Sequence, residues 1–207
     1  MTFSGFQPAD FEVFDIGGLE PRMEALIERV RPKLTALGDE LAPYLTELTG
    51  EEMFPHVAKH ARRTVHPPAD TWVAWGPSKR GYKALPHFQT GMFRSHLFIV
   101  FAVIYESGNK GILADALLRE SGSVLRELPG SYFWSTDHLD PSGTPHAEMD
   151  AERLAGLAHR LKEVKKAEVT CGLRIEAGDP VLADGQKLTG VIQDTFRTLL
   201  PLYKMAF

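Results

Sequence analysis

The sequence predicts an α+β fold, with a mainly antiparallel central sheet flanked by helices from both ends of the chain. Apolar residues recur at helical spacing near both ends, and short strand-like runs separated by Pro and Gly occupy the middle. Two of these runs are arranged as a hairpin around Arg94–Ser95. A parallel sheet would instead need a crossover helix between most successive strands.

The chain is expected to fold as one domain over residues 1–207. Its length suits a single domain, and 43% apolar with 24% charged residues is typical of a globular protein. The sequence shows no internal repeat, no low-complexity tract and no segment composed like a flexible linker.

Two helical regions are predicted before residue 50. The first is a short segment that ends at Gly17–Gly18 and turns three aromatic side chains inward, namely Phe6, Phe11 and Phe14. The second follows an amphipathic pattern from Leu19 to Leu48. Proline lacks an amide proton and glycine is a weak helix former, so we expect Pro32 and Gly38 to divide this region into two or three pieces.

Strands are predicted in the middle of the chain, at residues 71–75, 86–93 and 96–105. The last is apolar on both faces, so it should be central in the sheet, with Phe101 and Ile104 nearly fully buried. Trp72 and Trp75 are three residues apart on one strand, so they should face opposite sides of the sheet.

The rest of the chain mixes helices and strands. The predicted order is a helical pattern at 112–124, a strand at 132–135, a helix from about Asp150 to Lys166, a strand at 167–175 and a closing helix at 188–200. The helix after Asp150 begins with acidic residues and ends with lysines, which matches the helix dipole.

Composition favours a cytoplasmic protein without a membrane segment. Cys171 is the single cysteine, so no disulfide can form within the chain. The longest apolar run, Leu97–Tyr105, has nine residues, whereas a membrane-spanning helix needs about 20. Residues Met1–Phe6 have no basic stretch followed by an apolar run, so we expect no targeting peptide.

Charge is distributed unevenly along the chain. The formal net charge is −4, yet the segment His56–Arg94 carries +6, because it contains seven Lys or Arg residues and one acid, Asp70. Four of the eight histidines lie there, together with the aromatic residues Trp72, Trp75, Tyr82 and Phe88. We therefore expect this segment to attract an anionic ligand.

The basic residues of this segment suggest a clamp for a small anion. In the turn Ser78–Lys83, a glycine between cations lets the backbone approach a ligand, and arginine can hold phosphate or carboxylate through two parallel bonds. The expected ligand-binding residues are Arg62, Arg63, Lys79, Arg80, Lys83, His56 and His60, with His87 and Gln89 as neutral hydrogen-bond partners. The alternative is a solvated basic turn, since the GxxxxGK[ST] pattern is absent.

His56 and His60 should point the same way, because residues four apart share a face in a helix and in a strand. The sequence predicts no metal site, since a site needs three or four ligands and the chain has neither an HExxH pattern nor a cysteine pair. The alternative for both histidines is a structural role, with hydrogen bonds to neighbouring groups.

Nucleophilic catalysis has little support in the sequence. No serine lies in a GxSxG elbow, and Cys171 has no adjacent histidine. Asp137, His138 and Asp140 could supply acid–base groups, but a polar turn of Asp, His, Pro and Gly needs no function to explain it.

The sequence resembles the YktB-like family of bacterial proteins. The likeness is carried by MFPHVAKHARR at residues 53–63, by PPAD, WVAW, SKRGYK, LPHFQ and IYES after it, and by LEPRMEALIERVRPKL and VKKAEVTCG elsewhere. It extends over most of the chain. The resemblance implies a compact α+β domain in the bacterial cytoplasm, and it supplies no cofactor or catalytic residue to carry over.

The sequence is compatible with three functions. The leading hypothesis is a binding module for a small anionic, phosphorylated ligand. The second is an enzyme acting on a phosphate-bearing substrate, with His56 or His60 as the acid–base group. The third, binding of single-stranded nucleic acid, is disfavoured by the acidity of the whole chain. The sequence predicts neither a cofactor nor an oligomeric state.

Overall fold

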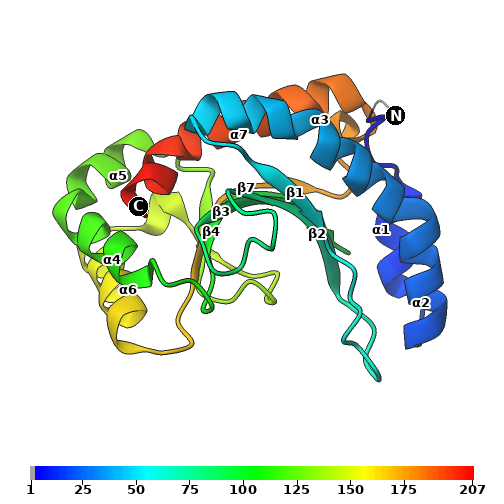
Figure 1. Cartoon of the computed structure of the whole chain (residues 1–207), viewed down its shortest axis with the longest axis horizontal. Coiled ribbons are helices and arrows are strands. Elements are labelled where there is room, and N and C mark those ends of the chain that lie inside the picture. Colours follow the sequence, from blue (N-terminus) through cyan, green and yellow to red (C-terminus); the bar gives the residue numbers. More distant parts are fainter. Residues whose placement is uncertain (1–2) are drawn as a thin grey trace.

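A seven-stranded antiparallel sheet lies at the centre of the protein (Figure 1). The computed structural model describes residues 3–207, so the expectation for Met1–Phe6 falls partly outside the described residues. The strand order is β1-β2-β3-β4-β7-β5-β6, with antiparallel neighbours, which confirms the α+β class. The strands are β1 (Phe54–Val57), β2 (Asp70–Gly76), β3 (His87–Phe93), β4 (His96–Val103), β5 (Phe133–Ser135), β6 (Thr144–Pro145) and β7 (Val169–Glu176).

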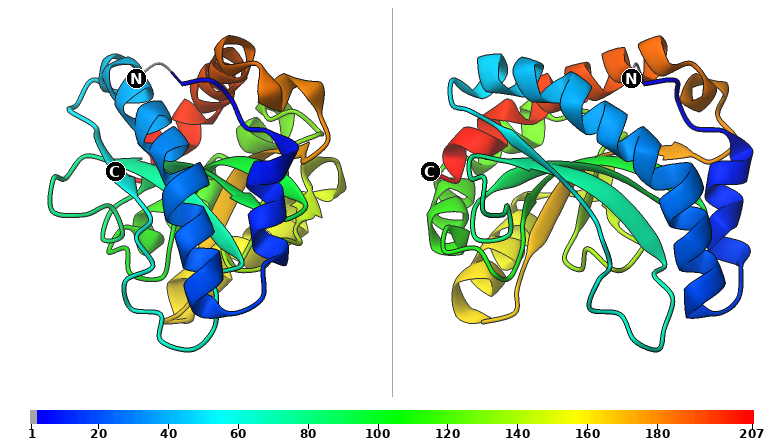
Figure 2. Two further views of the ribbon diagram at one scale, coloured as in Figure 1. Left: turned by 90° about the vertical axis from the view of Figure 1, so that its right-hand side faces the viewer. Right: turned by 45° about the vertical axis from the view of Figure 1, so that its right-hand side comes forward.

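Two long helices from opposite ends of the chain cover one face of this sheet. α3 packs on β1 and β2, α7 packs on β4 and β7, and the two helices contact each other (Figure 2). Helices α4, α5 and α6 pack on one another beside the sheet. The helices are α1 (Pro8–Glu12), α2 (Leu19–Ala25), α3 (Arg31–Thr49), α4 (Lys110–Arg119), α5 (Ser121–Glu127), α6 (Ala151–Glu163) and α7 (Gly185–Met205).

The N-terminal helices differ from the prediction at one position. Pro32 marks a boundary, as expected: it lies in the first turn of α3, directly after a π-helical turn at Leu26–Val30. The break expected at Gly38 is wrong, because α3 continues through it. A Cβ at residue 38 would lie 3.1 Å from Pro55 Cβ and from Val73 Cγ2, so glycine serves here to let the helix approach the sheet closely.

The predicted centre of the sheet is confirmed. β4 lies between β3 and β7. Phe101 in this strand is 1% exposed, and Ile104, directly after the strand, is 2% exposed. The main apolar core fills the space between the sheet and the helices. Trp75 is fully buried in it, and its Nε1 donates a hydrogen bond to the Gly38 carbonyl at 2.9 Å.

The opposite face of the sheet, called here the second face, carries a separate apolar cluster. Phe93, Phe98, Val100 and Phe133 form this cluster, and Trp72 packs against it. Trp72 and Trp75 therefore lie on opposite faces, as predicted. The loops 77–86 and 136–143 fold back onto this second face and supply further side chains to it.

The C-terminal half follows the predicted order with one division. The helical pattern at 112–124 consists of two helices, α4 and α5, that are interrupted at Glu120. Glu120 has a non-helical backbone conformation there, with φ −103° and ψ 17°, and the first turn of α5 that follows contains Gly122, a weak helix former. α6 begins as expected after Asp150, whose side chain accepts a hydrogen bond from the Arg153 amide at 2.8 Å. Within residues 3–207, none of the helices combines the length and apolar character needed to cross a bilayer.

Candidate functional site

Polar side chains converge on the second face of the sheet from two strands. In β7, alternate residues face this side, among them Thr170 and Arg174, and Glu168 precedes the strand in the same alternation. β3 contributes His87 and Gln89, which are both buried. Polar groups at these depths need defined partners, because an unpaired one costs free energy.

His87 and Gln89 form a hydrogen bond whose direction follows from their surroundings. Burial lowers the pKa of His87 to about 4, so its ring is neutral near pH 7. Nδ1 of His87 donates to the Leu85 carbonyl at 2.8 Å, so Nε2 must be an acceptor. The Gln89 amide nitrogen, 2.9 Å away, donates to it. The amide oxygen of Gln89 is thereby directed away from His87.

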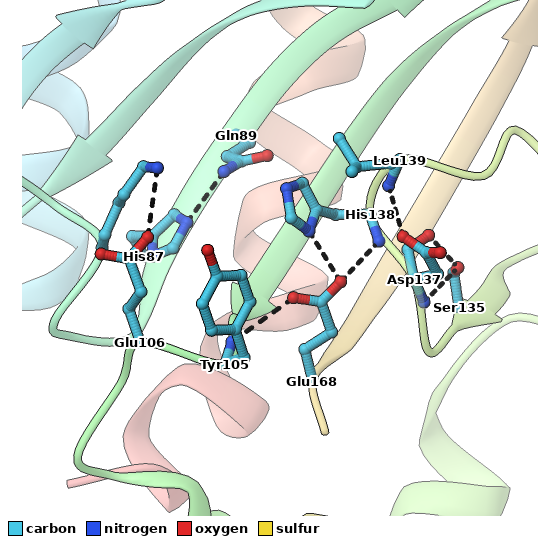
Figure 3. A network of polar contacts seen from close by, with 10 residues as sticks. His87, Gln89, Tyr105, Glu106, Ser135, Asp137, His138, Leu139 and Glu168 are labelled. Carbon is cyan, nitrogen blue, oxygen red and sulfur yellow. Dashed lines mark hydrogen bonds and ion pairs between the residues drawn. The ribbon is translucent and has the colours of Figure 1, made fainter. Parts of the chain in front are cut away.

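His138 and the buried Glu168 form a partly buried ion pair at the centre of this polar network (Figure 3). Nδ1 of His138 donates to a Glu168 carboxylate oxygen at 2.6 Å, and the His138 backbone amide donates to the same oxygen at 2.8 Å. The Tyr105 amide approaches the second oxygen at 3.4 Å. The other ring nitrogen of His138 points toward Gln89 in Figure 3. This is the arrangement of a histidine oriented by a carboxylate.

The pKa shifts of this pair favour its charged form. Burial alone would lower the pKa of His138, but the hydrogen bond and charge of Glu168, with help from Asp70 and Asp137, leave that pKa raised. Burial would raise the pKa of Glu168, but its hydrogen bonds from His138 leave that pKa lowered. Both shifts favour the imidazolium form of His138 against an ionised Glu168.

Arg174 adds a second cation to the network. Its guanidinium lies 3.7 Å from the centre of the Phe133 ring, and Nη2 donates to the Ser142 carbonyl at 2.7 Å. Nε of Arg174 is buried, and nothing in residues 3–207 accepts a hydrogen bond from it. A buried charged donor without an acceptor is rare in proteins and calls for an explanation.

These groups surround a narrow pocket, called here the second-face pocket. It lies between the sheet and the loop 136–143, and its volume of about 20 Å³ has room for one water molecule. Rings and apolar side chains form part of its wall, namely Phe93, His96, Phe98, Val100 and Phe133. The polar part of the wall consists of Gln89, Ser135, Asp137, His138, Asp140, Thr170 and Arg174.

A buried carboxyl group lies on the same face. Asp70 is 2% exposed, and burial raises its pKa to about 6, although His138 and Arg63 oppose the shift. Nearby, Trp72 Nε1 donates to the Tyr82 hydroxyl at 2.8 Å. Burial raises the pKa of that hydroxyl to about 12, so it remains protonated.

His56 and His60 lie at the border of this face, beside the Trp72–Tyr82 pair. Nε2 of His56 donates to the Ser78 carbonyl at 2.9 Å, and its ring lies 5.6 Å from that of Tyr82. The His60 ring lies edge-on to Trp72 at 5.5 Å, and burial lowers its pKa to about 4. Both rings thus approach one aromatic pair and have structural partners. Their contact with a ligand stays a prediction.

The five basic residues expected to bind an anion lie in two separate loops. Arg62 and Arg63 are in the loop before β2, and Lys79, Arg80 and Lys83 are in the loop after it, so the two groups lie at opposite ends of this strand (Figure 1). All five are exposed. Lys83 forms an ion pair with Glu106 at 3.2 Å, and Lys79 lies over the Phe54 ring. The structure therefore does not gather them into one cluster.

A wider cleft of about 580 Å³ lies between the loop 136–143 and α6. Arg153 and Arg160 line it together with Asp137 and Asp140, so neither sign of charge predominates. The second-face pocket is smaller, but its wall includes the buried Nε of Arg174, which has no acceptor in residues 3–207, and the carboxylate-oriented His138, so it is the better candidate for a site.

Three possible metal ligands come together at the edge of this pocket. One atom each from Asp137, His138 and Glu168 lie within 4.8 Å of one another. His138 and Glu168 are already hydrogen-bonded to each other, and Asp137 accepts from the Leu139 amide at 2.9 Å. The absence of a metal from the protein's function stays a prediction.

Comparison with known proteins supports the resemblance read from the sequence. The model of a domain of unknown function, DUF1054, matches residues 6–203. The chain belongs to this family. A UPF0637 protein of Bacillus velezensis is 49% identical over 99% of this chain and 98% of its own length, and one of Bacillus cytotoxicus is 44% identical over 99% of both. DUF1054 carries no assigned function, so the function has to be argued from the site.

Proposed function

We propose that the protein binds a small anionic metabolite at the second-face pocket, with Arg174 and His138 as its cationic contacts. The observation that carries this proposal is the buried Nε of Arg174, which has no acceptor among residues 3–207 and lines the same pocket as His138. A carboxylate or phosphate oxygen would accept its hydrogen bond and offset its charge.

The residues predicted from the sequence have places in this proposal. Gln89 lines the pocket, and His87, which does not line it, would act by orienting the Gln89 amide. The five exposed cations of the two loops would act at longer range: they raise the local concentration of an anion and accelerate its encounter with the site. This long-range effect would weaken as ionic strength rises.

The loop 136–143 must move to admit a whole ligand, because the pocket has room for one water-sized group. Two contacts hold the loop against the sheet: the His138–Glu168 pair and the bond from Arg174 to Ser142. Both contacts would open to admit the ligand and form again once it is bound. Loops of this kind commonly gate binding sites.

Thermal denaturation with carboxylated and phosphorylated metabolites tests the proposal. A ligand at a hundred times its Kd would stabilise the folded state by about 2.7 kcal/mol and raise the melting temperature. Arg174→Gln should abolish this shift. Arg197→Gln, which removes an exposed arginine on α7, should preserve it. The proposal fails if no anion shifts the wild-type protein, or if the shift survives Arg174→Gln.

The loop cations can be tested separately. Arg80→Ala should reduce the association rate of a bound anion at low salt and leave its dissociation rate unchanged. If Arg80→Ala instead accelerates dissociation to the same degree as Arg174→Gln, the clamp predicted from the sequence contacts the ligand directly.

An enzyme acting on a phosphate-bearing substrate is the second candidate, and one observation favours it. The His138–Glu168 pair leaves the second ring nitrogen of His138 facing the pocket, where it would donate a proton to a leaving group. His87 is less suited because both of its ring nitrogens bond to protein groups, and His56 because its Nε2 already donates to the Ser78 carbonyl. Phosphate release that is lost in His138→Gln but kept in His56→Gln would establish this activity.

A further inference from the structure

We infer that the group entering the second-face pocket is a hydroxyl, so that the ligand is a small hydroxy acid. This inference rests on the proposed function and adds the chemical class of the ligand. It follows from the hydrogen-bonding directions of Gln89 and His138, which line the pocket together.

The first direction is that of Gln89. Its amide nitrogen donates to His87 Nε2, because Nδ1 of the same ring is committed to the Leu85 carbonyl. The side-chain amide cannot rotate by half a turn without placing its oxygen against the acceptor Nε2. Gln89 therefore presents an acceptor, its amide oxygen, to the pocket. His87 acts as a positioning residue for this oxygen.

The second direction is that of His138. Glu168 accepts from Nδ1 at 2.6 Å, so this nitrogen carries a hydrogen whether the His138 ring is neutral or charged. The negative charge of the Glu168 carboxylate at this distance favours the imidazolium, in which the other nitrogen also carries a hydrogen and is a donor. Figure 3 shows this nitrogen pointing toward Gln89. The pocket thus presents one donor, from His138, and one acceptor, from Gln89.

A hydroxyl group satisfies both, because it accepts one hydrogen bond while donating another. A carboxylate or phosphate oxygen would accept from His138 but would meet the Gln89 oxygen as acceptor against acceptor. A methyl group would leave both partners unpaired, which costs more than a hydrogen bond gains. The volume of about 20 Å³ also fits a water-sized group.

The anionic end of the ligand would then lie at Arg174. Gln89 pairs with Val100 and Arg174 pairs with Phe98 on the two sides of β4, so the two side chains are displaced along the sheet as well as across it. The hydroxyl and the anionic group are therefore separate ends of one small molecule. A ligand with both ends would bridge β3 and β7.

Matched pairs of small acids test this inference in NMR titrations of the full chain. The hydroxy acids are glycolate, hydroxypropionate and hydroxybutyrate, hydroxylated at the terminal carbon, and the reference acids are acetate, propionate and butyrate. Molecules of this size should bind in the millimolar range. We expect at least one hydroxy acid to bind about tenfold more tightly than its reference acid, or better.

Gln89→Met removes the acceptor and should bring the two members of that pair to equal affinity. Thr90→Val is the matched control on the same strand: it removes the Thr90 hydroxyl, which has no partner within residues 3–207, and should keep the preference. The acid pairs on the wild-type chain test the inference even if Gln89→Met does not fold. Equal binding of hydroxy and reference acids, lost in Arg174→Gln, would overturn the hydroxyl inference and leave the proposed function standing. Binding by neither series would overturn both.

Discussion

The His138–Glu168 pair should stabilise the fold through a coupling of about 2 kcal/mol near pH 6, measured in a double-mutant cycle. The side chains are 21% and 6% exposed, and Nδ1 of His138 lies 2.6 Å from the carboxylate oxygen. Hydrogen bonds between charged groups at this burial contribute about 1.5–3 kcal/mol. His138→Leu, Glu168→Gln and the double variant complete the cycle.

The coupling should depend on pH in a defined direction. The pKa of His138 is raised from 6.5, so its contribution is fully present below 6.5 and is lost as pH rises through the folded-state value. The pKa of Glu168 is lowered from 4.5, so its contribution is present above 4.5 and is lost as pH falls through the folded-state value. The coupling should therefore be largest between these two ordinary values.

Urea denaturation of the four proteins at about pH 6 and about pH 9 measures this coupling. The exposed pair Lys162–Asp115, with the same 2.6 Å separation, is the control and should couple by less than about 1 kcal/mol. A His138–Glu168 coupling below about 0.5 kcal/mol at the lower pH, or one equal at both pH values, would refute the charged pair.

Three further predictions concern stability. Phe101→Ala should cost about 3–5 kcal/mol in chemical denaturation, because the side chain is 1% exposed at the centre of the sheet; a loss under about 1 kcal/mol would contradict its central position. Thr90→Val should leave stability unchanged or raise it by up to about 1 kcal/mol, since the buried hydroxyl has no partner in residues 3–207; a marked loss would reveal a partner. Burial lowers the pKa values of His60, His87 and His96 to about 4, so stability should fall as pH drops from 6.5 toward 4, and a flat urea midpoint over that range would contradict their burial.

The sequence predicts the fold correctly where the local hydrophobic pattern determines the secondary structure. The two-sided apolar run 96–105 predicts a central strand, and the adjacent run before Arg94–Ser95 predicts its hairpin partner; both are confirmed. The prediction at Gly38 was wrong because the helix propensity of a residue describes an isolated helix. Its role depends on the distance to Pro55 and Val73, which are brought near by folding.

The candidate site is harder to predict from the sequence, because it is formed by pairing between strands that are distant in the sequence. His138 reads as part of a polar turn, and only the pairing of β5 with β7 brings it to Glu168, thirty residues away. One signal was present: Glu168, Thr170 and Arg174 put polar side chains on one face of an otherwise apolar strand. A charged residue in that alternation indicates a buried polar partner on the same face.

The division of the sheet into two faces separates the main apolar core from the polar groups that would contact a ligand. None of the side chains lining the second-face pocket belongs to the main apolar core beneath α3 and α7. Codons for polar residues of the pocket such as Gln89, Thr170 and Arg174 can therefore be randomised together in a library while the main core beneath the helices remains intact. The sheet would then serve as a scaffold on which selection changes ligand preference, with the helix side as the constant part of every variant.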